Sequence, residues 1–293
     1  MSRNLRRIYW IGDEKNSGGY PPELPVRALL RDRGIEVVPI VWDRDPVPDP
    51  GEGELAIVRT PWDYVEKIDR FDLWISELPR ERIQNPAEIL GWNLDKTYLR
   101  ELSRSGVETV PTEWMDAKSA EAVAESIDRA FPGKTKIVKP VRSAGAHLTF
   151  RLSPGERPPP GSFVSVPAMI QPYLPEIESD GERSLVYFGG EFSHSIRKVP
   201  RSGDFRVQES FGGKFSEFSP SGKEREFGDS ALSAVRSRFP GFPPPLYARV
   251  DYVRVGEKPR LMELELLEPD LYFHHSPGSA ERFVASLFKS SGP

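Results

Sequence analysis

Two stretches near the C-terminal end of the chain alternate between apolar and polar side chains with the two-residue period of a β-strand. The residues between them, 255–259, form the turn of a predicted β-hairpin. The apolar face of that hairpin consists of Ala248, Val250, Tyr252, Met262, Leu264 and Leu266. If the turn is centred on Glu257, the polar face places Asp251 opposite Glu263 and Arg249 opposite Glu265.

The N-terminal part of the chain alternates predicted strands with predicted helices. Strands are expected at 5–11, 35–41 and 55–58, and helices at 22–33 and 66–78. This alternation is typical of a βαβ lobe with a parallel sheet. We therefore expect an α/β lobe at the start of the chain.

The remaining elements mix helices and strands in a less regular order. Helices are predicted at 93–105, from a cap at Asp116 to Ala130, at 223–238, and from a cap at Ser276 to Phe288. Strands are predicted at 109–114, 136–140, 168–171, 182–188 and 191–198, the last two joined by a tight Gly189-Gly190 turn. The proline-rich segment 153–162 is predicted to be an irregular connector.

Length and composition exclude several classes of protein. A chain of 293 residues is too long for one small core and suits two or three lobes. Its formal net charge of −4 gives no bulk attraction to nucleic acid or to a membrane surface. No apolar run approaches the roughly 20 residues of a membrane span, and an acidic segment stands where a signal cleavage site should be, so a cytoplasmic protein is expected. The absence of cysteine excludes disulfides, thiolate metal ligands and a cysteine nucleophile.

The polar face of the hairpin concentrates negative charge. Two carboxylates about 4 Å apart repel by about 4 kcal/mol at an effective dielectric near 20, and ordinary strand pairs avoid such a contact. A divalent cation removes the conflict, and carboxylate oxygens on two strands suit Mg²⁺ shared with nucleotide phosphates. The sequence therefore predicts a metal site at Asp251, Glu263 and Glu265, with a solvated sheet face as the alternative.

A phosphate site is indicated where the predicted strand 136–140 ends. Lys139 is followed by a loop of mostly small residues that contains Ser143. The ammonium group supplies positive charge, and small side chains let backbone N–H groups approach phosphate oxygens. Taken alone this signal is weak, because the loop does not have the Walker pattern.

Two further segments offer ligand contacts. The proline-constrained segment Gln171–Pro175 can present the Tyr173 C=O and the Leu174 N–H to the edge of a purine, or it can be a plain hinge between lobes. A cluster of cations is predicted to face the carboxylates, and it consists of Arg183, Arg197, Lys198 and Arg206.

Other residues have a functional and a structural interpretation. Arg59, Trp62 and Asp63 follow the third predicted strand and either contact a small substrate or form a capped loop. His194 is either a base or a packed strand histidine, with packing favoured. The pair His274-His275 lacks the spacing of a zinc site.

These motifs, in this order, resemble those of the ATP-grasp superfamily. The resemblance covers 93–290 and ends with the Asp251…Glu263-x-Glu265 pattern. Before that pattern come Lys96, Lys139 with its loop, the 171–174 hinge, Gly181-Glu182-Arg183-Ser184, Arg197 and the Phe-Arg-x-Gln-x-x-x-Gly-Gly segment from Phe205. The amino-acid sequences of segments 193–198 and 262–273 are most similar to those of the cyclo-ligase group of cycloserine biosynthesis.

The resemblance implies a role for each of these positions. Lys96 and Lys139 would hold the α and β phosphates of ATP beside Ser143, and Arg183 would also contact the nucleotide. Adenine would contact Gln171, Tyr173 and Leu174, and the ribose would contact Glu178. Arg197 and Arg206 would stabilise the transferred phosphoryl group, while Asp251, Glu263 and Glu265 would hold Mg²⁺, with Mn²⁺ as a substitute. Many members carry Asn where Glu265 stands, and a charged residue where Pro172 stands.

The implied fold combines α/β and α+β parts: a parallel βαβ lobe at 1–92, a middle lobe at 93–166 and a C-terminal lobe at 167–293, the last two enclosing ATP. The implied activity is ATP-dependent activation of a small-molecule carboxylate as an acyl-phosphate, which an amine then attacks, between molecules or by cyclisation. An amino acid or derivative is the expected substrate, without nucleic acid or membrane partners, and a homodimer is compatible with the resemblance. A small-molecule kinase and a nucleotide-binding regulatory protein are the alternatives on the same fold.

Overall fold

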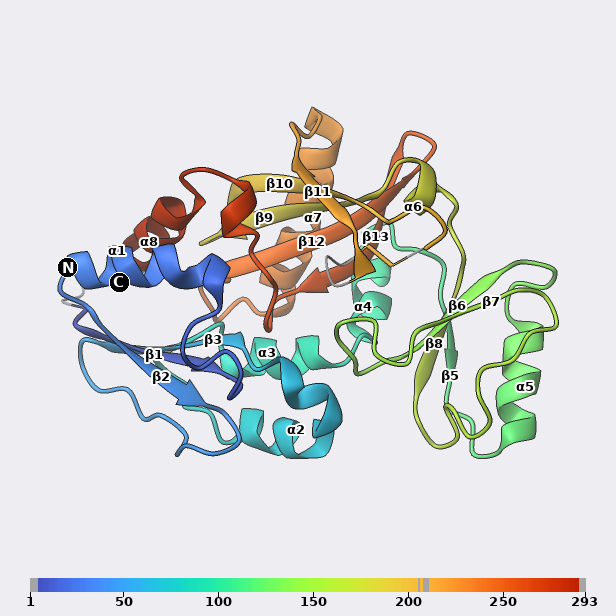
Figure 1. Ribbon diagram of the computed structural model, residues 1–293, viewed down its shortest axis with the longest axis horizontal. Helices are drawn as coiled ribbons and strands as arrows, with labels where there is room; N and C mark the ends of the chain where they lie inside the picture. Colours follow the sequence, from blue (N-terminus) through green and yellow to red (C-terminus); the bar gives the residue numbers. More distant parts are fainter. Residues whose placement is uncertain (1–4, 205, 208–210, 290–293) are drawn as a thin grey trace.

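Three β-sheets organise the residues that the computed structural model describes, which are 5–204, 206–207 and 211–289. The N-terminal sheet lies below the large C-terminal sheet in Figure 1, and the small middle sheet projects to one side. Strand β1 (Arg7–Gly12) and helix α8 (Ser279–Lys289), the first and last elements described, lie on the side opposite the middle sheet (Figure 1). Among the described residues, no helix has the length and apolar character needed to cross a bilayer.

The N-terminal sheet is parallel, as the alternating pattern predicts, with the strand order β2-β1-β3-β4. Its strands are β1 (Arg7–Gly12), β2 (Glu36–Val41), β3 (Glu54–Thr60) and β4 (Ile83–Gln84). Helices α1 (Leu24–Asp32) and α8 (Ser279–Lys289) pack on one face. Helices α2 (Ile68–Ser76) and α3 (Ala87–Leu94) pack on the other. Short 3-10 helices η1 (Pro21–Glu23) and η2 (Trp62–Glu66) follow the C-terminal ends of β1 and β3.

The middle sheet is antiparallel, with the strand order β5-β8-β6-β7. Its strands are β5 (Glu113–Met115), β6 (Lys136–Pro140), β7 (Phe150–Leu152) and β8 (Ala168–Pro172), and helix α5 (Ala120–Arg129) packs against them. The predicted boundary at 166/167 separates β8 from this sheet, yet β8 pairs with both β5 and β6.

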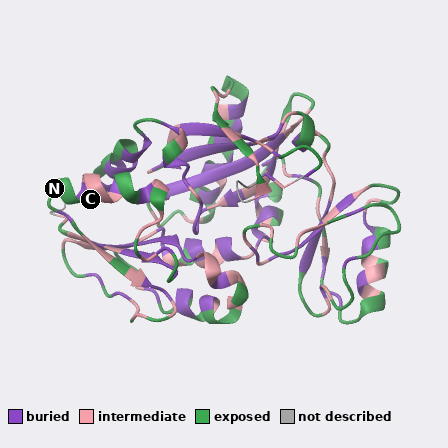
Figure 2. Cartoon of the chain, viewed as in Figure 1, coloured by how far each residue is buried: buried purple, intermediate pink, exposed green. Residues whose placement is uncertain are grey.

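The C-terminal sheet is antiparallel, with the order β11-β10-β9-β12-β13. Its strands are β9 (Glu182–Phe188), β10 (Glu191–Val199), β11 (Lys214–Glu217), β12 (Tyr247–Val255) and β13 (Lys258–Glu265). Helices α4 (Tyr98–Arg104) and α7 (Gly222–Arg238) cover one face, and the other face meets the N-terminal lobe. Figure 2 shows that the central strands of this sheet are buried along most of their length. The short helix α6 (Glu176–Ser179) precedes β9, and η4 (Phe273–His275) precedes α8.

The predicted pairing of Asp251 with Glu263 in the hairpin is confirmed, but the turn and the ladder that produce it differ from the prediction. Asp251 pairs with Glu263 as expected, while Val255 pairs with Lys258, so the turn contains two residues instead of five. A β-bulge at Met262 adds the residue that restores the expected register. As a result Met262 packs beside Val253, and its predicted position on the apolar face is wrong.

Several helix boundaries differ from the prediction. The predicted helix 93–105 consists of the end of α3 and of α4, with Lys96 at the break between them. Ser119, whose hydroxyl accepts from the Ala122 N–H, caps α5 in place of Asp116. Helix α8 begins at Ser279, three residues after the predicted cap, because Gly278 has a φ of +77° that a continuing helix excludes.

Candidate active site

The hairpin presents three carboxylates on one face of the C-terminal sheet. Residues paired directly across strands point to the same face. Asp251 pairs with Glu263 on one side and with Ser184 of β9 on the other, and Arg249 pairs with Glu265. The predicted meeting of these side chains on one face is therefore confirmed. This face is the one directed at the N-terminal lobe.

Cationic side chains neutralise this acidic face. Asp251 is only 2% exposed, and its carboxylate accepts from Arg249 Nε and Nη2 at 2.9–3.1 Å. It also accepts from Lys198 Nζ at 3.3 Å and from Ser184 Oγ at 2.5 Å. The alternative of a freely solvated carboxylate is wrong for Asp251, because burial and pairing leave it little contact with water.

Glu263 joins the hairpin to the middle part of the chain. Its carboxylate accepts from Lys139 Nζ at 2.5 Å, and Lys96 Nζ lies 3.5 Å from its other oxygen. Burial opposes the negative charge, but the two ammonium groups outweigh it and lower the pKa of Glu263 below its usual range. Both lysines predicted to bind phosphates thus meet a residue predicted to bind metal.

Glu265 has the opposite electrostatic character. Burial raises the pKa of Glu265 to about 8, against the attraction of Arg249, and the neighbouring charges of Asp251 and Glu263 add to the rise. The guanidinium of Arg249 lies between the carboxylates of Asp251 and Glu265 and hydrogen-bonds to both. One arginine therefore balances only part of the negative charge on this side of the hairpin.

The loop after β6 lies against Lys96. Lys96 Nζ donates to the carbonyl oxygen of Ser143 at 2.8 Å, and the Lys96 N–H donates to Val141 O at 2.8 Å. The Ser143 hydroxyl donates to Pro140 O at 3.2 Å, which closes the loop on itself. The structure thus places Lys96, Lys139 and Ser143 together, as the sequence predicts.

The hinge segment leaves two backbone groups available. The Gln171 side chain donates to Thr112 Oγ1 at 3.0 Å, and the Tyr173 N–H donates to Thr135 O at 2.9 Å. The Tyr173 C=O and the Leu174 N–H have no hydrogen-bond partner among the described residues. Glu178 accepts hydrogen bonds from the Tyr173 hydroxyl and from Arg151.

The predicted cluster of four cations facing the carboxylates is wrong for Arg183 and Arg197. Arg183 pairs with Tyr252 and Arg197 pairs with Arg183, so both point to the α7 face, where Asp180 binds them. Alternation along β10 explains this, because Lys198 is the neighbour that faces the carboxylates.

Arg206 is engaged elsewhere in this structure. Its Nε and Nη2 donate to the Asp204 carboxylate at 3.1 and 2.8 Å, and its guanidinium lies 3.8 Å from the centre of the Phe211 ring. Phe205 and Gln208, which belong to the predicted phosphate motif, lie outside the described residues.

Sequence reasoning placed Lys198 in the cation cluster facing the carboxylates, and this member does contact Asp251. It did not assign Ser184 or Arg249 to the site. The strand alternation contained a signal for Arg249, since it places that residue on the face of Asp251. Lys198 could be distinguished from Arg197 only with the register to β9, where Lys198 pairs with Glu182 and hydrogen-bonds to it.

The N-terminal lobe contributes an aromatic wall near the hairpin. Trp62 and Tyr20 pack edge to face with ring centres 4.8 Å apart. The Trp62 Nε1 donates to Glu268 O at 3.0 Å, and the Tyr20 hydroxyl donates to Asp270 at 3.0 Å. Arg249 Nη1 donates to Asp270 O at 3.0 Å, so this wall continues directly into the carboxylate face.

Two residues of the predicted substrate loop have structural partners instead. Arg59 is fully buried, and its guanidinium donates to Glu23 at 2.7 and 2.9 Å and to Pro269 O at 2.7 Å. Asp63 accepts from Trp42 Nε1 at 2.7 Å and from Lys67 at 2.8 Å.

His194 is a packed strand histidine. It is 3% exposed, and its Nε2 lies 2.9 Å from Leu271 O, to which the neutral ring donates. Burial lowers the pKa of His194 to about 4, so the ring is neutral at physiological pH. The structural interpretation of His194 therefore holds.

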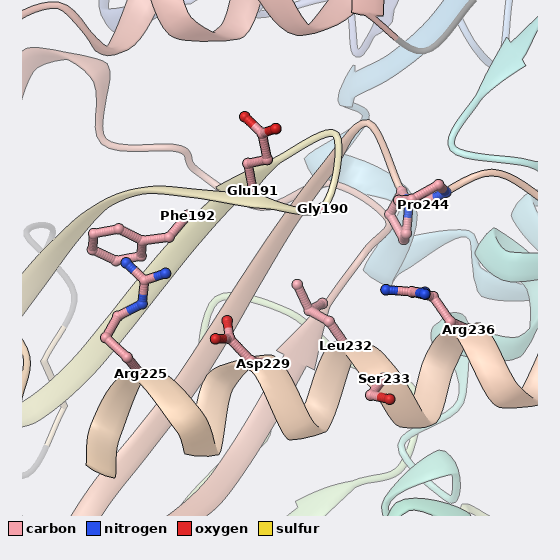
Figure 3. Close-up of a pocket in the computed structure, with 10 residues that line it drawn as sticks. Gly190, Glu191, Phe192, Arg225, Asp229, Leu232, Ser233, Arg236 and Pro244 are labelled. Carbon is pink, nitrogen blue, oxygen red and sulfur yellow. The ribbon is translucent and has the colours of Figure 1, made fainter. Parts of the chain in front are cut away.

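A cavity of about 430 Å³ lies between α7 and the β9–β10 turn (Figure 3). Its walls include Phe192, Arg225, Asp229 and Arg236 (Figure 3). Helix α7 covers the sheet face opposite the carboxylates, so this cavity contributes nothing to the candidate site.

The donor set on the hairpin suits a divalent cation. Within the described ranges no group of three or more His, Cys, Asp or Glu side chains is arranged as a ready metal site, because lysines and Arg249 occupy the carboxylates. The chemistry nevertheless fits Mg²⁺, which prefers carboxylate oxygens. Burial, with Asp251 and Glu263 nearby, raises the pKa of Glu265, and a cation bound at these carboxylates would favour its ionised form.

Comparisons with known proteins agree with this architecture. Residues 8–85 match the family model described as the N-terminal domain of D-cycloserine synthetase DcsG. The cycloserine biosynthesis protein DcsG of Streptomyces lavendulae is 27% identical over 284 residues, covering 92% of this chain and 93% of that protein. The crystal structure of D-cycloserine synthetase DcsG has a TM-score of 0.82 at 24% identity and covers 97% and 99% of the two chains. The ATP-grasp ligase PsnB, complexed with minimal precursor, Mg and ADP, has a TM-score of 0.61 at 15% identity over 97% of each chain.

The three sheets have the arrangement of the ATP-grasp fold, and the predicted fold is confirmed. Within that class the chain is similar to the cycloserine synthetase DcsG along almost its whole length.

Proposed function

We propose that this chain is an ATP- and Mg²⁺-dependent ligase that activates a small-molecule carboxylate and joins it to an amine. The contact of Lys96 and Lys139 with Glu263 is the observation that carries this proposal. It brings the groups suited to phosphates within reach of the groups suited to metal, as transfer of a phosphoryl group requires.

The nucleotide lies between the middle sheet and the C-terminal sheet in this proposal. Lys96 and Lys139 hold the α and β phosphates beside the Ser143 loop. The Tyr173 C=O and the Leu174 N–H, which have no partner among the described residues, contact the adenine edge next to Gln171. Glu178, anchored by Arg151 at 2.9 Å, is the candidate ribose contact.

Asp251, Glu263 and Glu265 are the proposed Mg²⁺ ligands, and Mn²⁺ is a suitable substitute. When bound, Mg²⁺ neutralises phosphate oxygens and helps the phosphoryl group to leave ADP. Arg249 and Lys198 face the same carboxylates and are the cations best placed to stabilise charge on the transferred group. They take the place of Arg197 in the proposal, while the role of Arg206 stays a prediction.

The proposed reaction has two balanced steps. A substrate carboxylate oxygen attacks the γ-phosphorus of ATP, and the bond from that phosphorus to the β-γ bridging oxygen breaks. ADP departs, and the substrate is now an acyl-phosphate. An amine then attacks the acyl carbon and loses a proton, and inorganic phosphate departs. The protein needs no nucleophile of its own, because positioning and charge neutralisation supply the catalysis.

The substrate is proposed to be an amino acid or a derivative. The wall formed by Tyr20 and Trp62 lies next to Asp270, which offers a carboxylate to an ammonium group. Similarity to a protein named for cycloserine biosynthesis supports this class and leaves both cyclisation and joining of two molecules open.

The test is ADP release from Mg-ATP with a panel of amino acids and analogues, singly and in pairs. Stimulation by one compound indicates cyclisation or a kinase, and product analysis for a phosphorylated compound separates the two. Stimulation that requires two compounds indicates ligation. Mg-dependent ATP binding without any stimulation across the panel would favour a regulatory protein and contradict the proposal.

Glu263→Gln supplies the matched loss-of-function variant. The change removes one charge and little volume, so the fold should persist while ADP release falls by about 100-fold or more. Glu257→Gln, at the exposed turn of the same hairpin, is the control and should leave turnover unchanged. Normal turnover in folded Glu263→Gln would refute the metal assignment.

A further inference from the structure

Strand β13 is an edge strand of the C-terminal sheet, and its free edge requires hydrogen-bond partners other than a strand. Leu264 and Leu266 direct their backbone groups to this edge, on either side of Glu265. An unsupported edge would allow the carboxylate between them to shift. The partners of this edge therefore decide how firmly Glu265 is held.

Asn93, near the end of α3, supplies the two hydrogen bonds that flank Glu265. Its Nδ2 donates to Leu264 O at 2.7 Å, and its Oδ1 accepts from the Leu266 N–H at 2.7 Å. The side-chain amide thus substitutes for the peptide group of a neighbouring strand. Asn93 is only 8% exposed, so water competes little for either bond.

Neighbouring residues extend the same support. The Leu264 N–H donates to the Tyr98 hydroxyl at 2.9 Å, and Asn85 Nδ2 donates to Leu266 O at 2.7 Å. Lys96, whose ammonium group approaches Glu263, lies between Asn93 and Tyr98. One short segment therefore fixes the backbone of β13 and also delivers a lysine to its carboxylates.

We propose that Asn93 is a positioning residue for the metal ligands, acting through the two backbone bonds on either side of Glu265. This inference rests on the proposed function. A metal site requires its carboxylates within a fraction of an ångström of a fixed geometry, and groups behind the ligands maintain that geometry. Asn93 touches neither metal nor nucleotide in this role.

The test is direct binding of Mn²⁺ in the presence of ADP, measured by water proton relaxation, which does not depend on turnover. Asn93→Ala should weaken Mn²⁺ binding by about 10-fold to 100-fold, the usual effect of losing a group behind a metal ligand. Alanine suits a helix, so α3 should form normally. Binding of ADP without metal should be unchanged.

Ser221→Ala is the matched control. It removes the side-chain cap of α7, which holds the Glu224 N–H, and lowers stability without touching β13. This variant should bind Mn²⁺ as the wild type does. If Asn93→Ala fails to fold, Asn93→Ser is the milder variant. Its shorter side chain also cannot bridge Leu264 O and the Leu266 N–H, so it gives the same comparison.

The outcomes separate the two proposals. Wild-type affinity for Mn²⁺ in Asn93→Ala or Asn93→Ser would overturn the positioning role while leaving the proposed function intact. Equal weakening in Ser221→Ala would also overturn it, because the effect would then follow stability. Absence of Mn²⁺ binding in the wild type with ADP would overturn the proposed function and the role of Asn93 together.

Discussion

Two glutamates that are two positions apart on β13 have opposite electrostatic environments. Lys139 and Lys96 keep Glu263 ionised, while burial among like charges raises the pKa of Glu265 to about 8. The difference follows from position: Glu263 lies toward the middle sheet, where the lysines are, and Glu265 lies toward Arg249 alone. The negative charge of the candidate cation site is thus already balanced by lysines at Glu263, whereas at Glu265 only Arg249 opposes it.

His194 should make the stability of the protein depend on pH. Its pKa is about 4 in the folded chain and near 6.5 when unfolded, so its contribution is full above pH 6.5 and is lost as the pH falls toward 4. Over that interval we expect a loss of about 3 kcal/mol from this group. Urea unfolding of the wild type and of His194→Gln at pH 7 and at pH 4.5 measures it.

The histidine variant should lose less stability on acidification than the wild type. His147→Gln, at an exposed position, is the control and should follow the wild type. Equal pH dependence in the wild type and His194→Gln would show that carboxylates elsewhere, and not His194, cause the acid sensitivity.

At the scale of elements, helix α7 approaches β9 closely at Gly228. A Cβ at this position would lie 2.2 Å from the Tyr187 hydroxyl and 2.6 Å from Leu185 Cδ1. Gly228→Ala should therefore cost about 1 to 3 kcal/mol through overpacking, despite the better helix propensity of alanine. Chemical denaturation measures the loss.

Adding Tyr187→Phe should recover part of the stability, because it removes the atom nearest to the new methyl group. Tyr187→Phe alone reports the effect of losing the hydroxyl. If the double variant is no more stable than expected from the two single changes, the close contact at Gly228 is not the cause.

The sequence predicts regular strands well and connections poorly. Strands β6 and β9 lie where their apolar patterns place them. The predicted Asp251–Glu263 pair is present, although a two-residue turn and the bulge at Met262 produce it in place of a five-residue turn. Helix α3 was missed because it is buried and mostly apolar, so it has no clear polar face to reveal it. Strand β7 was missed because three residues are too few for a period to be recognised.

The carboxylates of the candidate site were predictable because like charges on paired strands require an explanation. The cations were less predictable, because the sheet face that each one occupies depends on strand pairing. Like charges on facing strands pointed to Asp251 and Glu263. The choice between Arg197 and Lys198 depends on which strand lies beside β10, and a single sequence does not contain that pairing. Asn93 was invisible for a similar reason, since its partners are backbone groups about 170 positions later in the chain.

At the scale of the whole molecule, a buried ion pair joins the N-terminal lobe to the segment after the hairpin. Arg59 and Glu23 are 0% and 1% exposed, and Arg59 also donates to Pro269 O. The Arg59 guanidinium lies 4.6 Å from the centre of the Tyr247 ring in β12. The lobe that carries the aromatic wall is therefore fixed to the strand pair that carries the carboxylates.

Removing one partner of this pair should be more harmful than changing both. Arg59→Met leaves the Glu23 carboxylate buried without its cation and should cost about 3 to 5 kcal/mol. Arg59→Met with Glu23→Gln should lose less, since the amide oxygen can still accept from Trp10 Nε1. Urea unfolding of both variants decides, and a double variant less stable than the single one would contradict this account.

The bulge at Met262 has a consequence for how relatives of this chain can differ in length. Because the ladder on either side of the bulge is regular, Met262 is a supernumerary residue between Leu261 and Glu263. A homologue with one residue fewer here would keep its carboxylates on the same face, and a one-position gap in an alignment would not signal loss of the site. In this hairpin, β13 can therefore be one residue shorter and still present its carboxylates on the same face.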